Sequence, residues 1–396
     1  MKIALVHDWL TGMRGGEKVL DAICELVGPA DLYTLLLAPD KVWGRITENR
    51  IHTSFIQRLP FAKERYRYYL PFFPAAIESF DLSQYDLVLS TSHAVAKGVL
   101  SRSDALHVSY IHTPMRYVWE LFWEYFGDYR HGNVYRLAVT MAARRLREWD
   151  VISASRADHY LANSHHVRRR INHHWRREAE VVYPPVETER FTLGKQSGGY
   201  YLVVTSLVPY KRVDLAIQAA NKLGKKLVIV GDGPEKKNLQ KIAGPTIHFH
   251  GPVESNELNQ LYGEATALLF PGEEDFGIVP VEAMATGTPV VAFARGGAME
   301  TVVIPKRAKR DRLPVTGAGF PEQTLESLLT GIAELDTLEL DREKIRSVAM
   351  QFDRKKFMQR YSSAIASRWI LHGGDASDLP QRICEEAGTI GDSGRD

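Results

Sequence analysis

Cysteine is almost missing from this sequence. The 396 residues contain only Cys24 and Cys384, which lie far apart in the chain. Two such cysteines provide neither a disulfide framework nor the closely spaced ligands of a zinc site, and this usage suits a reducing compartment. We therefore expect a cytoplasmic protein.

Long apolar runs are missing as well. No stretch approaches the roughly 20 apolar residues that a membrane-spanning helix needs. The chain opens directly on an apolar strand, Lys2 to His7, and shows no signal peptide. Any contact with a membrane should therefore be peripheral, on the inner face of the cytoplasmic membrane.

An excess of one charge and the Asp-x-Asp pattern are also absent. Lys and Arg number 50 and Asp and Glu number 48, so the formal net charge is only +2, a total that supports no strong claim about nucleic acid. We expect no nucleic-acid partner, because no recognised binding module is present. No two aspartates stand two positions apart, which argues against the nucleotide-sugar enzymes that hold a divalent ion through such a pair. We expect neither a metal nor a cofactor.

What the sequence does contain is an alternation of apolar strands and helices, repeated in two halves. Ile3–Val6 opens the first half, and Tyr201–Val204 restarts the pattern after a break at Pro184-Pro185. We predict an α/β protein with two facing Rossmann-like, doubly wound domains and a cleft between them. The first domain should cover residues 1–186 and the second residues 187–351.

The most informative stretch is residues 271–289, PGEEDFGIVPVEAMATGTP, in which residues 278–285 have helical composition. Glu274 before this helix and Glu282 within it can hold one ligand at two points. The Phe276-Gly277 step leaves backbone N–H groups at the helix start, where phosphate binds readily. A nucleotide-sugar offers both hydroxyls and phosphates. The alternative is that the acidic residues of the loop are ordinary partners of the helix dipole.

Three segments of this stretch resemble the retaining glycosyltransferases of the GT-B fold. They are Glu274-Asp275-Phe276-Gly277, Glu282-Ala283-Met284-Ala285 and Gly287-Thr288-Pro289-Val290. The resemblance implies that Glu274 contacts hydroxyls of the donor sugar as part of the catalytic site. It also implies that Glu282 holds the ribose and that the helix start binds the donor through Phe276, Gly277 and Ile278.

A second donor-binding segment follows the strand that restarts the pattern. Lys211 and Arg212 stand at its strand-to-helix turn, which suits a diphosphate leaving group, although a solvated helix start is the alternative. The family has a lysine at the position of Lys211, which we take as catalytic, and an arginine at that of Ser206. Either Arg212 supplies the missing charge here, or Ser206 donates a hydrogen bond instead.

Further donor contacts are implied by the resemblance alone. The loop with Gly15 and Gly16 matches one that faces the donor diphosphate, although it lacks the Gly-x-Gly-x-x-Gly spacing. Gly251 and Val253 match positions that line the base pocket. His112, at the carboxyl end of a strand, matches a histidine that reaches the transferred sugar. We include it among the catalytic residues as a sugar contact, without the role of general base.

The last part of the chain also follows the family. Residues 352–371 are amphipathic and resemble the family's final helix, which crosses back onto the first domain. Residues 372–396 are rich in Gly and Asp, and we expect a mobile tail.

Within the family, three segments resemble bacterial mannosyltransferases of surface-polysaccharide assembly. They are residues 6–10, 112–117 and 207–212. The resemblance implies GDP-mannose as donor and a polyprenyl-diphosphate-linked saccharide as acceptor, in polysaccharide, lipopolysaccharide or O-antigen synthesis. The alternatives are a UDP- or ADP-sugar donor, a sugar-nucleotide epimerase on the same fold, and a nucleotide-sugar-binding protein without turnover.

Two regions of the first half combine arginines with apolar side chains. Residues 65–73 alternate arginines and aromatics, which indicates either a core helix with snorkelling arginines or an interfacial patch that touches a membrane or a lipid-linked acceptor. Between residues 129 and 177 arginines far outnumber acids. They form either solvated helix faces or a basic surface that steers an anionic membrane or a diphosphate-linked acceptor. RNA binding is a third option, although the sequence contains no recognised RNA-binding module.

Overall fold

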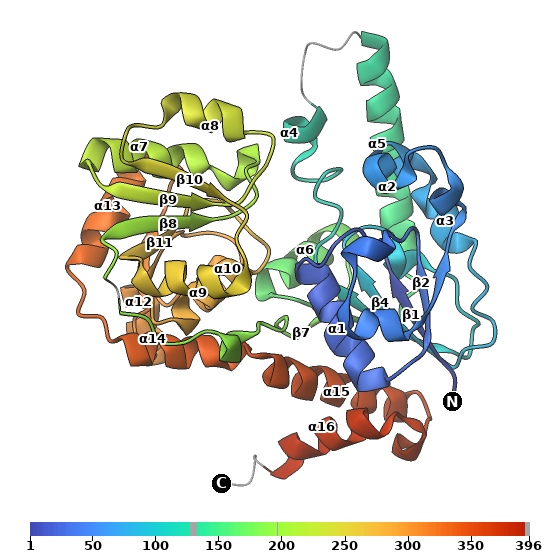
Figure 1. The fold of residues 1–396 in the computed structure, drawn as a ribbon. Coiled ribbons are helices and arrows are strands. Elements are labelled where there is room, and N and C mark those ends of the chain that lie inside the picture. Colours follow the sequence, from blue (N-terminus) through green and yellow to red (C-terminus); the bar gives the residue numbers. More distant parts are fainter. Residues whose placement is uncertain (127–132, 196, 393–396) are drawn as a thin grey trace. The chain divides into compact units, whose positions relative to one another are not determined.

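The protein folds into two compact units, seen in a computed structural model that describes residues 1–126, 133–195 and 197–392. The first domain consists of residues 1–185 together with 355–396, and the second domain consists of residues 186–354. These boundaries lie within three residues of those expected from the sequence. Figure 1 shows that each domain is a twisted sheet with helices on its faces.

The sheet of the first domain has seven parallel strands. In sheet order they are β3 (Arg50–Thr53), β2 (Asp31–Thr34), β1 (Ile3–His7), β4 (Leu87–Ser92), β5 (Leu106–Ile111), β6 (His159–Ala162) and β7 (Glu180–Val181). The chain order reverses between β1 and β4, and the carboxyl ends of such strands are where open α/β sheets bind ligands.

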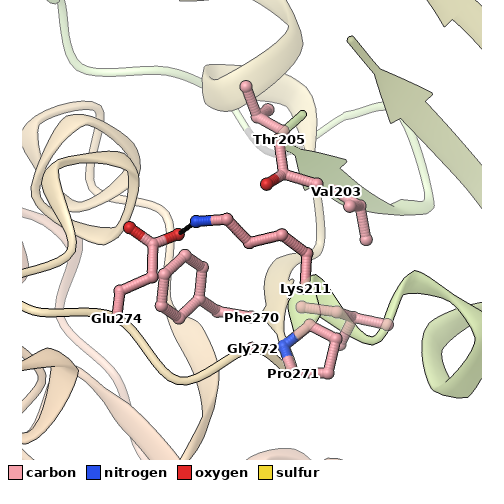
Figure 2. Close-up of a pocket in the computed structure, with 9 residues that line it drawn as sticks. Val203, Thr205, Lys211, Phe270, Pro271, Gly272 and Glu274 are labelled. Atoms are coloured by element: carbon pink, nitrogen blue, oxygen red, sulfur yellow. Dashed lines mark hydrogen bonds and ion pairs between the residues drawn. The ribbon is translucent and has the colours of Figure 1, made fainter. Parts of the chain in front are cut away.

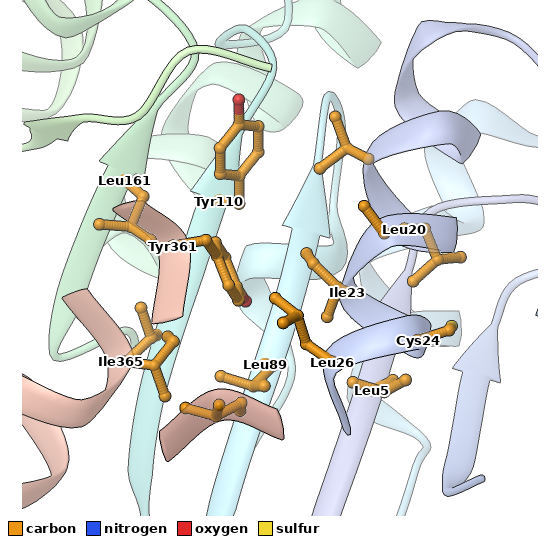
Figure 3. Packing of buried hydrophobic residues seen from close by; sticks show 14 of the residues in the cluster. Leu5, Leu20, Ile23, Cys24, Leu26, Leu89, Tyr110, Leu161, Tyr361 and Ile365 are labelled. Atoms are coloured by element: carbon orange, nitrogen blue, oxygen red, sulfur yellow. The ribbon is translucent and has the colours of Figure 1, made fainter. Parts of the chain in front are cut away.

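Helices cover both faces of this sheet. They are α1 (Gly15–Val27), α2 (Ala62–Arg65), α3 (Phe73–Glu78), α4 (Phe122–Phe126), α5 (Asn133–Ser153), α6 (His165–Trp175), α15 (Arg354–Leu371) and α16 (Gln381–Asp392). Leu5 points to the face covered by α1 and α15, where it packs in one cluster with Leu20 and Tyr361 (Figure 3). Its neighbours Ala4 and Val6 point to the opposite face, as alternation along a strand requires.

The second domain repeats the architecture with six parallel strands. In sheet order they are β10 (Ile247–Gly251), β9 (Lys226–Val230), β8 (Tyr200–Val204), β11 (Ala267–Phe270), β12 (Val290–Phe293) and β13 (Gly317–Phe320). Its helices are α7 (Val213–Leu223), α8 (Lys236–Ile242), α9 (Ser255–Glu264), α10 (Ile278–Ala285), α11 (Ala298–Thr301), α12 (Pro305–Asp311), α13 (Leu325–Asp336) and α14 (Arg342–Ala349). Here the chain order reverses between β8 and β11.

The end of the chain differs from the expectation of a mobile tail. Residues 376–378 form a 3₁₀ turn and residues 381–392 form α16. Leu379 and Ile383 are buried in the same cluster as α1, and Arg382 pairs with Glu25 of that helix. The prediction was wrong for these residues because a few well-spaced apolar side chains anchor a segment whose overall composition is polar.

Residues 60–80 also differ from a single core helix. They form α2, a 3₁₀ segment at Tyr66–Phe72 and α3, with Pro71 inside the 3₁₀ segment. Tyr66 and Phe73 are buried, whereas Tyr68 is 80% exposed. The segment therefore has a core side and an aromatic outer side. Within the described ranges, no helix combines the length and the apolar character needed to cross a bilayer.

Candidate active site

The switch point of the second domain brings together two loops that follow β8 and β11. A pocket lies between them, lined by Val203, Val204, Thr205, Lys211, Leu269, Phe270, Pro271, Gly272 and Glu274 (Figure 2). Gly272 permits this close approach, because a Cβ at that position would lie 3.0 Å from the Cα of Lys211. The two segments singled out from the sequence therefore form one site.

Lys211 and Glu274 meet in this pocket as an ion pair between Nζ and Oε1 (Figure 2). Their side chains are 14% and 22% exposed, so both reach solvent while their stems are covered. A cation and a carboxylate in a partly dehydrated site interact more strongly with a ligand than they would on an open surface. The arrangement can present a positive charge to a phosphate and oxygen acceptors to sugar hydroxyls.

The start of α10 is held beside this pair by close backbone packing. Gly277 has a φ of +91° and precedes the helix without a side-chain cap. The N–H of Gly297 donates to the carbonyl of Glu274 at 2.7 Å, and a Cβ at position 297 would collide with the backbone of Asp275. Phe276 is buried against Phe352, with ring centroids 5.6 Å apart. The loop and the first turn, including Ile278, are therefore fixed before a ligand binds.

Glu282 lies on α10 and is only 7% exposed. The hydroxyl of Tyr262 donates to its Oε2 at 3.1 Å. Burial, and then the charge of Glu282, raises the pKa of Tyr262 well above its usual value, so this hydroxyl keeps its proton. Sequence analysis missed Tyr262, because no pattern marks a tyrosine at the end of α9 as the partner of a glutamate on the next helix.

Arg212 lies next to Lys211 but turns toward a different partner. Its backbone is left-handed, with a φ of +51°. Its Nε and Nη2 donate to the two carboxylate oxygens of Asp214, each at 3.1 Å. Ser206 is exposed after β8. Both cations have a carboxylate partner, but Lys211 and its partner Glu274 line the pocket, whereas Arg212 does not.

The residues expected at the base pocket lie at the end of β10. Gly251 has a φ of +79°, and its carbonyl accepts the N–H of Gly231 at 2.9 Å. Val253 follows as a half-buried residue. In sheet order β9 separates β10 from β8, so these two residues belong to the same carboxyl edge as the ion pair.

In the first domain the structure brings His112 to the start of α1. Gly15 and Gly16 are the first two residues of that helix. A Cβ at Gly16 would lie 3.5 Å from Nε2 of His112, so the expected residues are neighbours. Burial, followed by the charge of His93, lowers the pKa of His112 to about 3, and the ring is therefore neutral at ordinary pH.

Asp8, which sequence analysis did not single out, organises the same edge. Its carboxylate is fully buried and accepts four backbone N–H bonds of 2.6 to 2.9 Å, from residues 93 to 96. It also lies 3.2 Å from Nδ1 of His93. Its position directly after a buried strand was the available signal, but its partners lie more than 80 residues away.

No group of three or more His, Cys, Asp or Glu side chains suited to a metal ion occurs in the part of the chain that the structure describes. The expectation that no metal or cofactor is needed stays a prediction.

Comparison with known families matches the chain from residue 15 to residue 350. Residues 185–350 match the family model of glycosyl transferases group 1, and residues 15–190 match that of glycosyltransferase family 4. The boundary between the two matches coincides with the boundary between the domains.

Several characterised proteins resemble parts of the chain. It is 35% identical over 136 residues to the sulfoquinovosyl transferase SQD2 of Arabidopsis thaliana, covering 34% of this chain and 25% of that protein. It is 30% identical over 152 residues to the O-antigen chain mannosyltransferase RfbU of Salmonella typhimurium, covering 35% and 43%. It is 32% identical over 176 residues to the GDP-mannose-dependent alpha-mannosyltransferase of Mycolicibacterium smegmatis, covering 41% and 46%. The matches thus span less than half of each relative.

Solved structures show the same fold at low identity. HepE of Anabaena, solved with UDP-glucose, has a TM-score of 0.63 at 17% identity and covers 93% of this chain and 100% of that one. Sucrose-phosphate synthase of Thermosynechococcus elongatus has a TM-score of 0.61 at 16% identity, with 99% of both chains covered. The fold is GT-B, with two Rossmann-like domains; the predicted cleft between them stays a prediction. By the two family matches, residues 185–350 belong to the glycosyl transferases group 1 and residues 15–190 to glycosyltransferase family 4.

Proposed function

We propose that this protein is a retaining glycosyltransferase that moves a hexose, α-mannose from GDP-mannose, to a lipid-linked saccharide in polysaccharide or O-antigen synthesis. The observation that carries the proposal is the pairing of Lys211 with Glu274 beside the uncapped start of α10. Two of the relatives with about 30% identity are mannosyltransferases, which supports the choice of sugar. The choice of acceptor rests on the resemblance to polysaccharide-assembly enzymes.

The leaving group would be the donor diphosphate. In this proposal its oxygens lie against the N–H groups at the start of α10, with Lys211 as counter-charge. Negative charge grows on the phosphate as its bond to the anomeric carbon stretches. Positive groups that are already in position stabilise that charge without reorganisation. Arg212, held by Asp214, would contribute only to the surrounding potential, and Ser206 would donate a neutral hydrogen bond.

The carboxylates would hold the donor and leave its anomeric carbon open. Glu274 would accept hydrogen bonds from sugar hydroxyls, and buried Glu282 would accept those of the ribose. His112 would contact the transferred sugar. The acceptor hydroxyl would attack on the face that the diphosphate leaves, so the anomeric configuration is retained. The carbon–oxygen bond to phosphate breaks, the new glycosidic bond forms, and the phosphate oxygen takes the acceptor proton.

A lipid-linked acceptor would bring the first domain to an anionic membrane surface. Trp123 on α4 is 69% exposed, and Leu137 and Met141 on α5 are 65% and 46% exposed. Arg144 and Arg145 are exposed on the same helix. Apolar side chains next to arginines suit an interface with acidic headgroups. Of the arginine-rich stretch, residues 129–132 lie outside the described part of the chain.

The donor can be identified by thermal unfolding in the presence of GDP-, UDP- and ADP-sugars. Ligand binding to the folded state raises the unfolding temperature by mass action. We expect GDP-mannose to give the largest shift and to be turned over when a lipid-linked saccharide is added. A larger shift with a UDP- or ADP-sugar would reject the GDP-mannose assignment. Epimerised nucleotide-sugar without transfer would reject the transferase assignment.

Glu282→Gln tests whether the glutamates act on the donor. Loss of a charge-assisted hydrogen bond should weaken donor binding by roughly 10- to 100-fold. Glu334→Gln removes an exposed carboxylate on α13 of the same domain and should leave binding unchanged. Unaffected turnover in the Glu282→Gln enzyme would contradict the proposed site.

Sedimentation with vesicles of acidic phospholipid tests the membrane contact. Binding should fall as salt rises, because the arginines act through screened charges. Trp123→Ser should weaken it, whereas Trp43→Ser, which removes a tryptophan that is 62% exposed elsewhere on the first domain, should not. Binding that is absent, or that does not depend on salt, would reject the contact.

A further inference from the structure

Three histidines gather at the carboxyl edge of the first domain. His7 ends β1, His93 follows β4 and His112 follows β5, and these three strands are neighbours in the sheet. The ring centroids of His7 and His93 are 6.0 Å apart, and those of His93 and His112 are 6.1 Å apart. His7 is fully buried. The reaction proposed above assigns a sugar contact to His112 and no role to His7.

Two of these rings carry nitrogens that have no hydrogen-bond partner. Nε2 of His7 and Nε2 of His112 are both buried and unpaired among the described residues. Buried polar atoms in native proteins usually have a hydrogen-bond partner. Two such nitrogens without a partner, at the carboxyl ends of neighbouring strands, therefore need an explanation.

Both rings border the space in front of Gly16. A Cβ at that position would lie 3.5 Å from Nε2 of His112 and 3.7 Å from Cε1 of His7, and both are ordinary contact distances. A group the size of a methyl would therefore fit over Gly16 in contact with both rings. The glycine keeps this space open, because any other residue would fill it with its own side chain.

The ring of His7 is held in place by its other nitrogen. Nδ1 of His7 lies 2.6 Å from the hydroxyl of Thr91 on the neighbouring strand, a residue that is 1% exposed. The next residue, Asp8, fixes the loop after β4 through its four N–H bonds. Nε2 of His7 therefore points in a set direction without using its own hydrogen-bonding capacity.

The charge state of the two rings narrows the class of ligand. Burial, and then the charges of His93 and His112, lowers the pKa of His7 well below its usual value. His112 is also neutral, as described above. A neutral imidazole nitrogen either donates or accepts one hydrogen bond, depending on the tautomer. A hydroxyl can do both, whereas a phosphate oxygen mainly accepts and an ammonium group only donates.

We propose that Nε2 of His7 joins Nε2 of His112 in a subsite over Gly16 that binds a sugar hydroxyl, with Thr91 and Asp8 as positioning residues. The new element is His7 as a second hydroxyl ligand. The proposal rests on the proposed function in that the hydroxyl belongs to one of the two sugars of a transfer reaction. The donor sugar and the acceptor sugar share this chemistry, and the experiment separates them.

Two substitutions of His7 distinguish the roles of its two ring nitrogens. His7→Asn keeps a polar atom near the position of Nδ1, for Thr91, and loses Nε2. His7→Gln places an amide near the position of Nε2. His107→Gln is the matched control, because His107 is a fully buried histidine of the same sheet that lies within β5, away from Gly16. Unfolding temperatures of all three variants show whether each has kept its fold.

Binding is measured with GDP-mannose and with GDP, and turnover with a lipid-linked saccharide. If the hydroxyl belongs to the donor, His7→Asn weakens GDP-mannose binding by roughly tenfold or more and leaves GDP binding unchanged. If it belongs to the acceptor, the affinities for GDP-mannose and for GDP stay unchanged, and the KM for the acceptor rises by a similar factor. His7→Gln should recover part of either loss, and His107→Gln should show none.

Wild-type values for all of these quantities in folded His7→Asn protein would overturn the subsite while leaving the transferase assignment intact. If the protein binds GDP-mannose without turnover, the transferase assignment is rejected. The comparison of GDP-mannose and GDP binding between wild type and His7→Asn would still decide the role of His7. Should His7→Asn unfold, the same comparison is made with His7→Gln and with ¹⁵N-labelled histidine in the wild type. The Nε2 signals of His7 and His112 should move with GDP-mannose or with the saccharide, and not with GDP. Signals unmoved by either sugar would then overturn the subsite.

Discussion

The two domains place different chemistry at the same point of the same fold. At the switch point of the second domain, Lys211 and Glu274 are ionic and partly exposed. At that of the first domain, His7 and His112 have buried nitrogens and neutral rings. A Rossmann-like sheet thus supplies a position for a site, and the side chains at its edge decide which ligand groups the site can take.

The difference has an electrostatic cause. Charged groups keep their charge when they are paired and near water, as Lys211 and Glu274 are. Unpaired imidazoles in a dry environment lose theirs. The second domain therefore suits a diphosphate, and the first suits neutral hydroxyls. The predictions below test this contrast, from the largest expected effect to the smallest.

The largest expected difference is in acid stability: lowering the pH should destabilise the first domain more than the second. His107, whose pKa burial lowers to about 4, and His112, at about 3, are neutral in the fold and take protons near pH 6.5 when unfolded. Their stabilisation is complete above pH 6.5 and is lost as the pH falls below it, by about 4 kcal/mol together near pH 5. His248 and His250, the histidines of the second domain, are exposed.

Hydrogen exchange at pH 7 and near pH 5 measures this effect domain by domain. Amides of β5 should lose protection and those of β11 should keep it. His107→Gln should reduce the acid loss in the first domain. Equal losses in both domains would contradict the contrast.

Lys211→Ala should reduce turnover by about 100- to 1,000-fold, because about 3 kcal/mol of transition-state stabilisation is removed with the cation. Lys222→Ala, which removes an exposed lysine of α7, should have little effect. Steady-state rates with a saturating donor measure the change. A loss smaller than tenfold would mean that the charge at this switch point is not used on the leaving group.

Asp8→Asn should destabilise the first domain by about 2–3 kcal/mol. The new amide group would face two backbone N–H donors that the carboxylate now satisfies. Denaturant unfolding measures the loss, and exchange of the amides of residues 93–96 locates it. Asp81→Asn, at an exposed position of the same domain, should change stability by less than about 0.5 kcal/mol. Similar losses in both variants would show that Asp8 does not organise this edge.

Gly16→Ala should leave stability unchanged or raise it by up to about 1 kcal/mol, because alanine favours the helix. Its methyl group would occupy the space between His7 and His112, so activity should fall at least tenfold. Gly12→Ala adds a methyl group where nothing lies within 4 Å and should keep activity. Thermal unfolding and rate measurements on the same samples make the comparison. Wild-type activity in Gly16→Ala would show that this space stays unused.

The sequence predicted the elements that have strong local signals. The expected helix at residues 278–285 is confirmed, because an apolar run bounded by Gly and Pro specifies it. The short strands β6 and β13 were not predicted; β13 contains two glycines and has little β-propensity. Lys211 and Glu274 were each expected at the donor site, but the ion pair between them was not predicted.

Other parts of the site depend on contacts that no local pattern reveals. The left-handed backbone of Arg212 and its pairing with Asp214 could not be predicted from the amino-acid sequence. The same holds for Asp8, because its four partners are on another strand-end loop. Long-range hydrogen bonds of this kind are set by the fold as a whole, so a single sequence shows the residue and not its role.

The path of the chain has a consequence for how the protein is made. The first domain is interrupted after residue 185 and resumes at residue 355, and its core includes Tyr361, Ile365 and Ile383. The second domain is one continuous segment. During synthesis on the ribosome, the second domain can therefore finish folding before the last helices of the first domain have been made. Shortening the gene from its 3′ end would damage the half that was synthesised first.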